Sequence, residues 1–210
     1  MKKYVQFGCG LDAPKEWVNY DASPTLIIQQ IPIVGKLLTP MLNVGFPKNV
    51  LFGDIIKGLP EKSNSCDGVY SSHTLEHLSL NDFRIAIQNV YAILKPNGTL
   101  RIVVPDIEFL ARNYLQELEK GNSEAAMDFI KSSLLGKETK GRNFKEKISN
   151  LLGNSHHLWM WDYASMKTEL VKIGFVNIRR CLYNDSKDAF FELVERESRF
   201  INALAIECSK

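Results

Sequence analysis

The chain has 210 residues, and a single domain is the better expectation at this length. Apolar residues make up 45% of the sequence and charged residues 24%, which excludes a disordered or low-complexity chain. The 26 basic and 24 acidic side chains leave a formal charge of +2, too balanced for a general electrostatic grip on nucleic acid, so we expect no nucleic-acid partner.

Membrane and secretion signals are not evident. No run of about 18 uninterrupted apolar residues occurs, so we expect no stable membrane insertion. The basic start, Met1-Lys2-Lys3, is not followed by the apolar stretch of a signal peptide. The cysteines, Cys9, Cys66, Cys181 and Cys208, lie far apart and form no CxxC pair, which favours reduced thiols in a cytoplasmic protein.

Short apolar runs bounded by turn residues indicate buried strands. In chain order they cover 4–7, 17–20, 50–52, 68–70 and 99–104, with two last strands at 175–183 and 202–208. Several of the first five end in polar residues. In an open parallel sheet the carboxyl ends of the strands form the ligand-binding edge.

Helical periodicity lies between these runs. Apolar residues recur at three- and four-residue spacing over 83–94, with a capping pair at Ser79 and Asp82 and a stop at 95–98. Further helices are predicted at 107–119 and at 166–173, the latter ended by Gly174. Strands that alternate with helices indicate an α/β sheet.

Two segments, 22–48 and 121–155, interrupt this alternation. We interpret both as insertions around the ligand edge, so that residues 1–210 form one domain. The first is apolar but broken by prolines. Packing against the sheet is favoured for it, and a lid, an acceptor channel or a membrane-surface patch are alternatives.

Glycines follow the first predicted strand, at Gly8-Cys9-Gly10, where they permit a tight turn and close approach of a ligand. Asp21 ends the next strand, where a carboxylate is able to accept hydrogen bonds from two ribose hydroxyls. Asp21 lies only 13 positions after Gly8, and Ala13 replaces the third glycine of a dinucleotide fingerprint. This spacing disfavours a nicotinamide-dependent oxidoreductase.

More specific motifs follow in order: Gly53-Asp54-Ile55, then DGVYSSHTLEHL over 67–78, then LKPNGTLRIVVPD over 94–106. In this order they resemble the class I S-adenosylmethionine-dependent methyltransferases, from about Lys3 to Asp106 and more weakly over 163–209. The stretch HLWMWD at 157–162 is similar to one in a bacterial subgroup of small predicted methyltransferases. The resemblance implies a Rossmann-like sheet, mostly parallel with an antiparallel C-terminal strand pair and helices on both faces.

The resemblance also implies S-adenosylmethionine as cofactor and assigns site residues. Gly8 and Gly10 would line its amino-acid part, Asp21 would hold the ribose, Asp54 and Ile55 the adenine, and Ser72 and His73 would border the methyl end. The full expected cofactor set is Phe7, Gly8, Cys9, Gly10, Asp21, Ala22, Gly53, Asp54, Ile55, Ser72 and His73. Two positions depart from the family pattern: Gln6 replaces an acid, and Asp12 replaces a third glycine.

Methyl transfer to a hydroxyl requires a base, and histidine suits this role near neutral pH. His73 is the first candidate, with His77, His156 or His157, and Asp106 as further catalytic candidates. Asp106 is a polar group that follows the fifth strand. The Trp- and His-rich stretch around 157–162 is an expected acceptor wall. No metal site is expected, because no third ligand is spaced with the pair in HTLEH.

The favoured function is therefore methyl transfer to a small-molecule or glycan-type acceptor, with the glycan part resting on the resemblance alone. The alternative is a non-catalytic S-adenosylmethionine-binding protein of the same fold, which the departures at Gln6 and Asp12 favour. The oligomeric state stays open.

Overall fold

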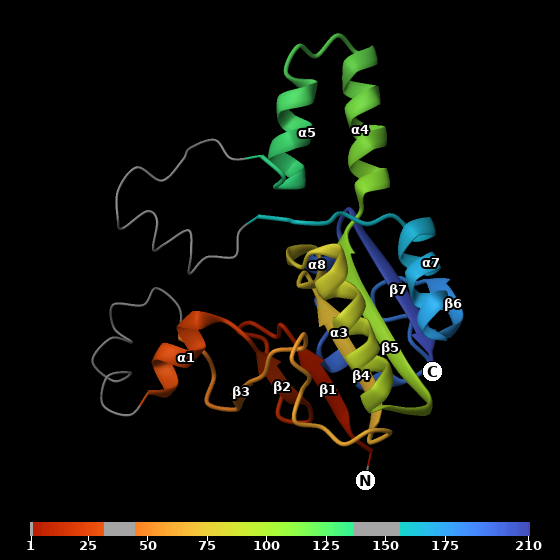
Figure 1. The fold of residues 1–210 in the computed structure, drawn as a ribbon. Coiled ribbons are helices and arrows are strands. Elements are labelled where there is room, and N and C mark those ends of the chain that lie inside the picture. Colours follow the sequence, from red (N-terminus) through yellow and green to blue (C-terminus); the bar gives the residue numbers. More distant parts are fainter. Residues whose placement is uncertain (1, 32–44, 137–155) are drawn as a thin grey trace.

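A computed structural model describes residues 2–31, 45–136 and 156–210 of the chain. Its centre is a seven-stranded sheet in the order β3-β2-β1-β4-β5-β7-β6 (Figure 1). The strands are β1 (Tyr4–Phe7), β2 (Val18–Asp21), β3 (Val50–Phe52), β4 (Cys66–Ser72), β5 (Leu94–Pro105), β6 (Val176–Arg180) and β7 (Ala203–Ser209). The predicted insertions at 22–48 and 121–155 lie partly outside the described residues.

Strand direction follows the expected pattern. The neighbouring pairs among β1 to β5 are all parallel. β7 is antiparallel to both β5 and β6, which confirms the predicted C-terminal pair. The chain order runs outward from β1 in one direction and from β4 in the other. This reversal creates a crevice at the carboxyl ends of β1 and β4.

One face of the sheet is covered by α3 (Leu80–Ile93) and α7 (Tyr163–Ile173). α3 begins at the Ser79 cap, whose hydroxyl accepts the backbone N–H of Asp82, as predicted. Asp162 and Ser165 form a capping box on α7, and Gly174 ends it at φ 113°. The buried residues of α3 recur at helical spacing and form its contact with the sheet: Phe83, Ala86, Ile87, Val90 and Ile93.

The other face carries shorter elements, η3 (Ala189–Leu193) and α8 (Glu197–Phe200). Phe191 of η3 is fully buried and makes edge contacts with Tyr4, Trp17 and Tyr70. Helices therefore lie on both faces, although those on the second face are only one or two turns long.

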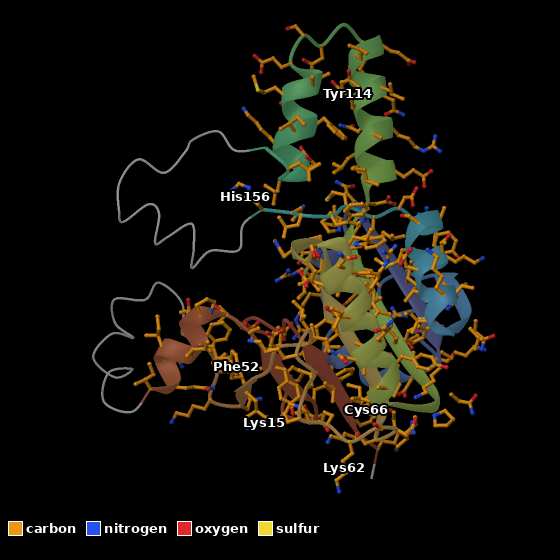
Figure 2. The ribbon with its side chains drawn as sticks, in the orientation of Figure 1. Lys15, Phe52, Lys62, Cys66, Tyr114 and His156 are labelled. Carbon is orange, nitrogen blue, oxygen red and sulfur yellow. The ribbon has the colours of Figure 1, made fainter. Side chains whose placement is uncertain are left out.

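The remaining helices lie around the carboxyl edge of the sheet. α1 (Pro24–Gln30) follows β2, and the 3-10 turn η2 (Leu75–His77) follows β4. α4 (Ile107–Glu119) and α5 (Ala125–Ser133) pair side by side and project away from the sheet (Figure 1). Tyr114 of α4, labelled in Figure 2, contacts Phe129 of α5 with ring centroids 5.7 Å apart.

Several element boundaries differ from the sequence prediction. β4 spans 66–72 rather than 68–70, β5 spans 94–105 rather than 99–104, and β7 spans 203–209 rather than 202–208. The helices α3 and α7 begin three residues earlier than expected. β2 starts one residue later than expected and includes Asp21. β6 is shorter than the predicted 175–183: Phe175 lies between α7 and β6, where its N–H donates to the Leu170 carbonyl, and the strand ends at Arg180. Within the described residues, no helix has the length and apolar character needed to cross a membrane.

Candidate functional site

The crevice holds a cavity of about 470 Å³, a size in the range of small-molecule sites. It opens at the carboxyl ends of β1, β2, β3 and β4. Its lining comes from the ends of these strands, the start of α1 and the turn η2: Phe7, Gly8, Asp21, Ala22, Ser23, Pro24, Gly53, Asp54, Ile55, Ile56, His73, Thr74, His77 and Leu78.

Eight of the eleven residues expected to bind cofactor line this cavity: Phe7, Gly8, Asp21, Ala22, Gly53, Asp54, Ile55 and His73. The other three, Cys9, Gly10 and Ser72, do not. Cys9 and Ser72 border a separate cavity of about 30 Å³ behind the glycine turn. Most of the residues expected to bind the cofactor therefore lie around one cavity. Their contacts with the cofactor stay a prediction.

Gly8 turns the chain at the end of β1. Its φ is +64°, a region that residues with a Cβ rarely adopt. A Cβ at this position would lie 2.0 Å from Thr74 Oγ1. Gly8 therefore allows the β1 turn and the β4 turn to pack directly against each other, and both residues line the cavity.

Asp21 is buried at the end of β2 and fixes the glycine turn. One carboxylate oxygen accepts the N–H of Gly10 at 2.9 Å, and the other accepts the N–H of Ser23 at 2.7 Å. Asp54 has a similar arrangement: Oδ1 accepts the N–H of Ile56 at 3.0 Å, and Lys57 lies 3.3 Å from Oδ2. An ionised carboxylate has about four acceptor sites, so Asp21 and Asp54 are each able to accept further hydrogen bonds from a ligand in the cavity.

The two departures from the family pattern are bonded to protein groups. The Gln6 amide donates to the Asp12 carbonyl and to Asn19 Oδ1, each at 2.6 Å. The Asp12 carboxylate pairs with Arg196 at 2.7 Å. Neither side chain lines the larger cavity. The Gln6 bond fixes the backbone at Asp12, and the Asp12–Arg196 ion pair connects the C-terminal segment to the glycine turn.

His73 connects the larger cavity with a second one. It has a φ of +51°, and its Nε2–H donates to the Arg199 carbonyl at 2.9 Å. Its Nδ1 lies 3.5 Å from Glu76 Oε1. The second cavity, about 350 Å³, is lined by His73, Pro105, Phe109, Leu110, Asn113, Ser132, Ile201 and Asn202. The strained backbone thus places one imidazole in the walls of both cavities.

His77 and His157 lie together beside Glu76. Their ring centroids are 5.1 Å apart, and His157 Nε2 is 3.9 Å from Glu76 Oε1. Burial lowers the pKa of His157, an effect that the Glu76 carboxylate opposes. His77 lines the larger cavity, whereas His157 is buried and lines neither cavity. The sequence did not indicate Glu76 as a site residue, because its burial depends on the distant stretch that carries His157.

The stretch 156–161 crosses the turn η2. The N–H groups of Leu158 and Trp159 donate to the Glu76 carbonyl, and Figure 2 shows His156 beside the foot of α5. Trp161 is fully buried against Phe83, with ring centroids 4.2 Å apart, so it is a core residue. Trp159 is partly exposed.

Asp106 lines neither cavity, although its neighbour Pro105 lines the second one. Its carboxylate caps α4 by accepting the N–H of Glu108 at 2.9 Å, and Arg180 lies 3.4 Å from its second oxygen. Asp106 therefore acts as a helix cap and as an ion-pair partner of Arg180.

Comparison with known families matches residues 6–102 to the methyltransferase domain. This segment contains the end of β1, all of β2 to β4, most of β5, and the whole lining of the larger cavity. No curated protein sequence matches the chain.

Solved structures share the fold at low identity. A SAM-dependent methyltransferase from Thermotoga maritima, described as a possible histamine N-methyltransferase, is 17% identical, with a TM-score of 0.51 over 100% of this chain and 83% of that one. A SAM-dependent methyltransferase from Archaeoglobus fulgidus is 15% identical, with a TM-score of 0.50 over 100% and 86%. Another from Mesorhizobium loti is 13% identical, with a TM-score of 0.51 over 99% and 90%. These similarities show a shared α/β fold.

Proposed function

We propose that the chain, a member of the class I S-adenosylmethionine-dependent methyltransferases, binds this cofactor in the 470 Å³ cavity and methylates a small-molecule or glycan-type acceptor held in the 350 Å³ cavity. The observation that carries the proposal is the position of His73. Its side chain borders both cavities, at the end of β4 where the resemblance expects the methyl group.

The polar groups of the larger cavity suit the cofactor. Asp21 keeps its orientation through two backbone N–H groups and has further acceptor sites for two ribose hydroxyls. Asp54 and Ile55 follow β3, where an acceptor for the adenine amino group and an apolar contact for the ring lie next to each other. The methionine end then points toward Gly8, Thr74 and His73.

The second cavity suits a polar acceptor. Asn113, Ser132 and Asn202 offer donors and acceptors, and Phe109 and Ile201 offer apolar surface. Apolar surface combined with a few polar groups is typical of sites that bind small molecules. Because Phe109, Asn113 and Ser132 belong to α4 and α5, the projecting helix pair determines which acceptor fits.

Bound in the larger cavity, S-adenosylmethionine supplies a methyl group already activated by a sulfonium sulfur. The protein must hold the acceptor in line with that methyl group and remove the acceptor proton. His73 Nε2 donates to the Arg199 carbonyl, which leaves Nδ1 to take the proton. The Glu76 carboxylate lies 3.5 Å from Nδ1, close to the position where the positive charge forms.

Calorimetric titration with S-adenosylmethionine, S-adenosylhomocysteine and NAD tests cofactor binding. We expect micromolar binding of the first two alone, about −8 kcal/mol. Asp21→Asn should weaken it strongly, whereas Asp67→Asn, at the opposite end of β4, should not. Binding of NAD alone, or full affinity in Asp21→Asn, would refute the assignment.

Turnover is tested by S-adenosylhomocysteine release in a screen of hydroxyl-bearing acceptors. His73→Asn should leave cofactor affinity largely intact and lower the rate by about 10²-fold or more. Full activity in this variant would show that His73 is not the base. The alternative function, cofactor binding without transfer, predicts tight binding with no release for any acceptor. The engagement of Gln6 with Asp12 and Asn19 is the observation that favours it.

A further inference from the structure

We propose that Glu76, His77 and His157 bind a divalent transition-metal ion in the wall of the larger cavity. One potential ligand atom from each residue lies within 4.8 Å of the others. Two residues come from the turn η2 and the third from the stretch that crosses it. This site goes beyond the proposed methyl transfer and revises the expectation drawn from HTLEH alone.

Glu76 is the first reason. Its side chain is 1% exposed, and neither carboxylate oxygen has a hydrogen-bond partner. A buried carboxylate loses its hydration, and this cost is large unless a cation or several donors compensate it. His73 Nδ1 lies 3.5 Å and His157 Nε2 lies 3.9 Å from Oε1, and neither makes a hydrogen bond to it. A metal ion would supply the missing partner.

The orientation of the two histidines is the second reason. His77 Nδ1 lies 3.0 Å from the His156 carbonyl, and His157 Nδ1 lies 2.8 Å from the Ser133 carbonyl. A carbonyl accepts only, so each Nδ1 carries the proton and each Nε2 keeps its lone pair. Metal-binding histidines characteristically donate their other ring N–H to a carbonyl or carboxylate in this way, which fixes the tautomer and the ring direction.

The three ligand atoms must move closer together to hold a metal. Metal bonds to His nitrogen and carboxylate oxygen are about 2.0–2.2 Å, which places tetrahedral ligand atoms about 3.3 Å apart. The Glu76–His157 separation of 3.9 Å exceeds this by about half an ångström, and all three atoms lie within 4.8 Å of one another. We expect rotations of the side-chain dihedrals to close these gaps when the ion binds.

The donor set selects the class of ion. Two imidazoles and one carboxylate are borderline ligands, suited to Zn²⁺, Co²⁺, Ni²⁺ or Fe²⁺ and poorly suited to Mg²⁺ or Ca²⁺, which prefer oxygen. Three protein ligands within the described residues leave a coordination position open. Because His77 lines the larger cavity, the ion lies at that cavity's wall. The proposed base, His73, is not one of its ligands.

Zinc binding is measured on the full chain after chelation and dialysis, without S-adenosylmethionine, by calorimetry with Zn²⁺. Co²⁺ is the second probe, because its visible absorption reports nitrogen and oxygen ligands. We expect one equivalent of Zn²⁺ in the wild type, and at least a tenfold lower affinity in Glu76→Gln and in His157→Ala. These substitutions lie on different segments and remove different ligand types. Circular dichroism serves as the control that each variant is folded.

The matched control is His156→Ala. It removes the neighbouring histidine but keeps the backbone carbonyl that orients His77. Its zinc affinity should equal that of the wild type. Absence of zinc binding in the wild type, wild-type zinc affinity in Glu76→Gln and His157→Ala, or an equal loss of affinity in His156→Ala would overturn the site. Because the titration omits cofactor and acceptor, its failure is distinguishable from failure of the proposed methyl transfer.

Discussion

Replacement of Gly8 by alanine is the sharpest perturbation of the larger cavity. The new Cβ would lie 2.0 Å from Thr74 Oγ1, 2.6 Å from Cγ2 and 2.8 Å from Cβ. The backbone would also keep a φ of +64° with a Cβ present. Two separate costs therefore act at one position: an unfavourable backbone conformation and a steric overlap with the β4 turn.

The magnitudes of these costs follow from their causes. The left-handed conformation costs a residue with a Cβ about 1–2 kcal/mol. Overlap with a packed side chain adds about 1–3 kcal/mol. We expect Gly8→Ala to lower the free energy of unfolding by about 2–5 kcal/mol. Gly10→Ala is the matched control, because Gly10 has a φ of +56° but nothing within 4 Å of its Cβ position. It should lose only the first amount.

Urea denaturation of both variants gives the comparison, and calorimetry with S-adenosylmethionine gives the effect on the cavity. Thr74→Ala removes the two atoms closest to the new Cβ, so the double variant Gly8→Ala/Thr74→Ala should recover part of the lost stability. Equal destabilisation by Gly8→Ala and Gly10→Ala, with no recovery in the double variant, would refute the steric argument.

Other features give further predictions. Arg101→Met should cost about 3–5 kcal/mol in urea denaturation, because the guanidinium is fully buried and its loss leaves the buried Glu195 carboxylate unpaired. Arg84 and Lys172 lower the pKa of Glu169 from 4.5 to about 2, so its stabilisation is complete above pH 4.5 and is lost between pH 4.5 and 2. Glu169→Gln should accordingly flatten the stability profile in that window, and an unchanged slope would contradict the ion pairing. A chelator should lower the melting temperature of zinc-loaded wild type and leave Glu76→Gln unaffected.

Much of the fold was predictable because it depends on local patterns. α4 has the predicted bounds, and α3 ends at Ile93, before the predicted stop at 95–98. The length of β6 was not predictable, because it is limited by distant contacts. After Arg180 the chain turns, and the Leu182 carbonyl accepts a hydrogen bond from the buried Arg101 of β5.

Some residues of the candidate site were predictable from the sequence and others were not. Residues at the ends of consecutive strands, such as Asp21 and Asp54, were predictable because parallel strands bring their carboxyl ends to one edge. Glu76 was not, because its burial requires the stretch 156–161 to cross the turn η2. Asp106 also lies at the end of a strand, which made it a candidate site residue. In the structure its carboxylate caps the helix α4 that follows.

The α4–α5 pair links these observations. Leu134 is the C-cap of α5, and its φ of +53° turns the chain. The carbonyls of Ser133 and Leu134 then accept hydrogen bonds from the ring Nδ1 and the backbone N–H of His157. The same pair supplies Phe109, Asn113 and Ser132 to the second cavity. A shift of this helix pair would therefore move the acceptor wall and His157 together, so acceptor binding should change the zinc affinity of the cluster. Equal zinc affinity with and without a bound acceptor would show that the helix pair does not couple the two sites.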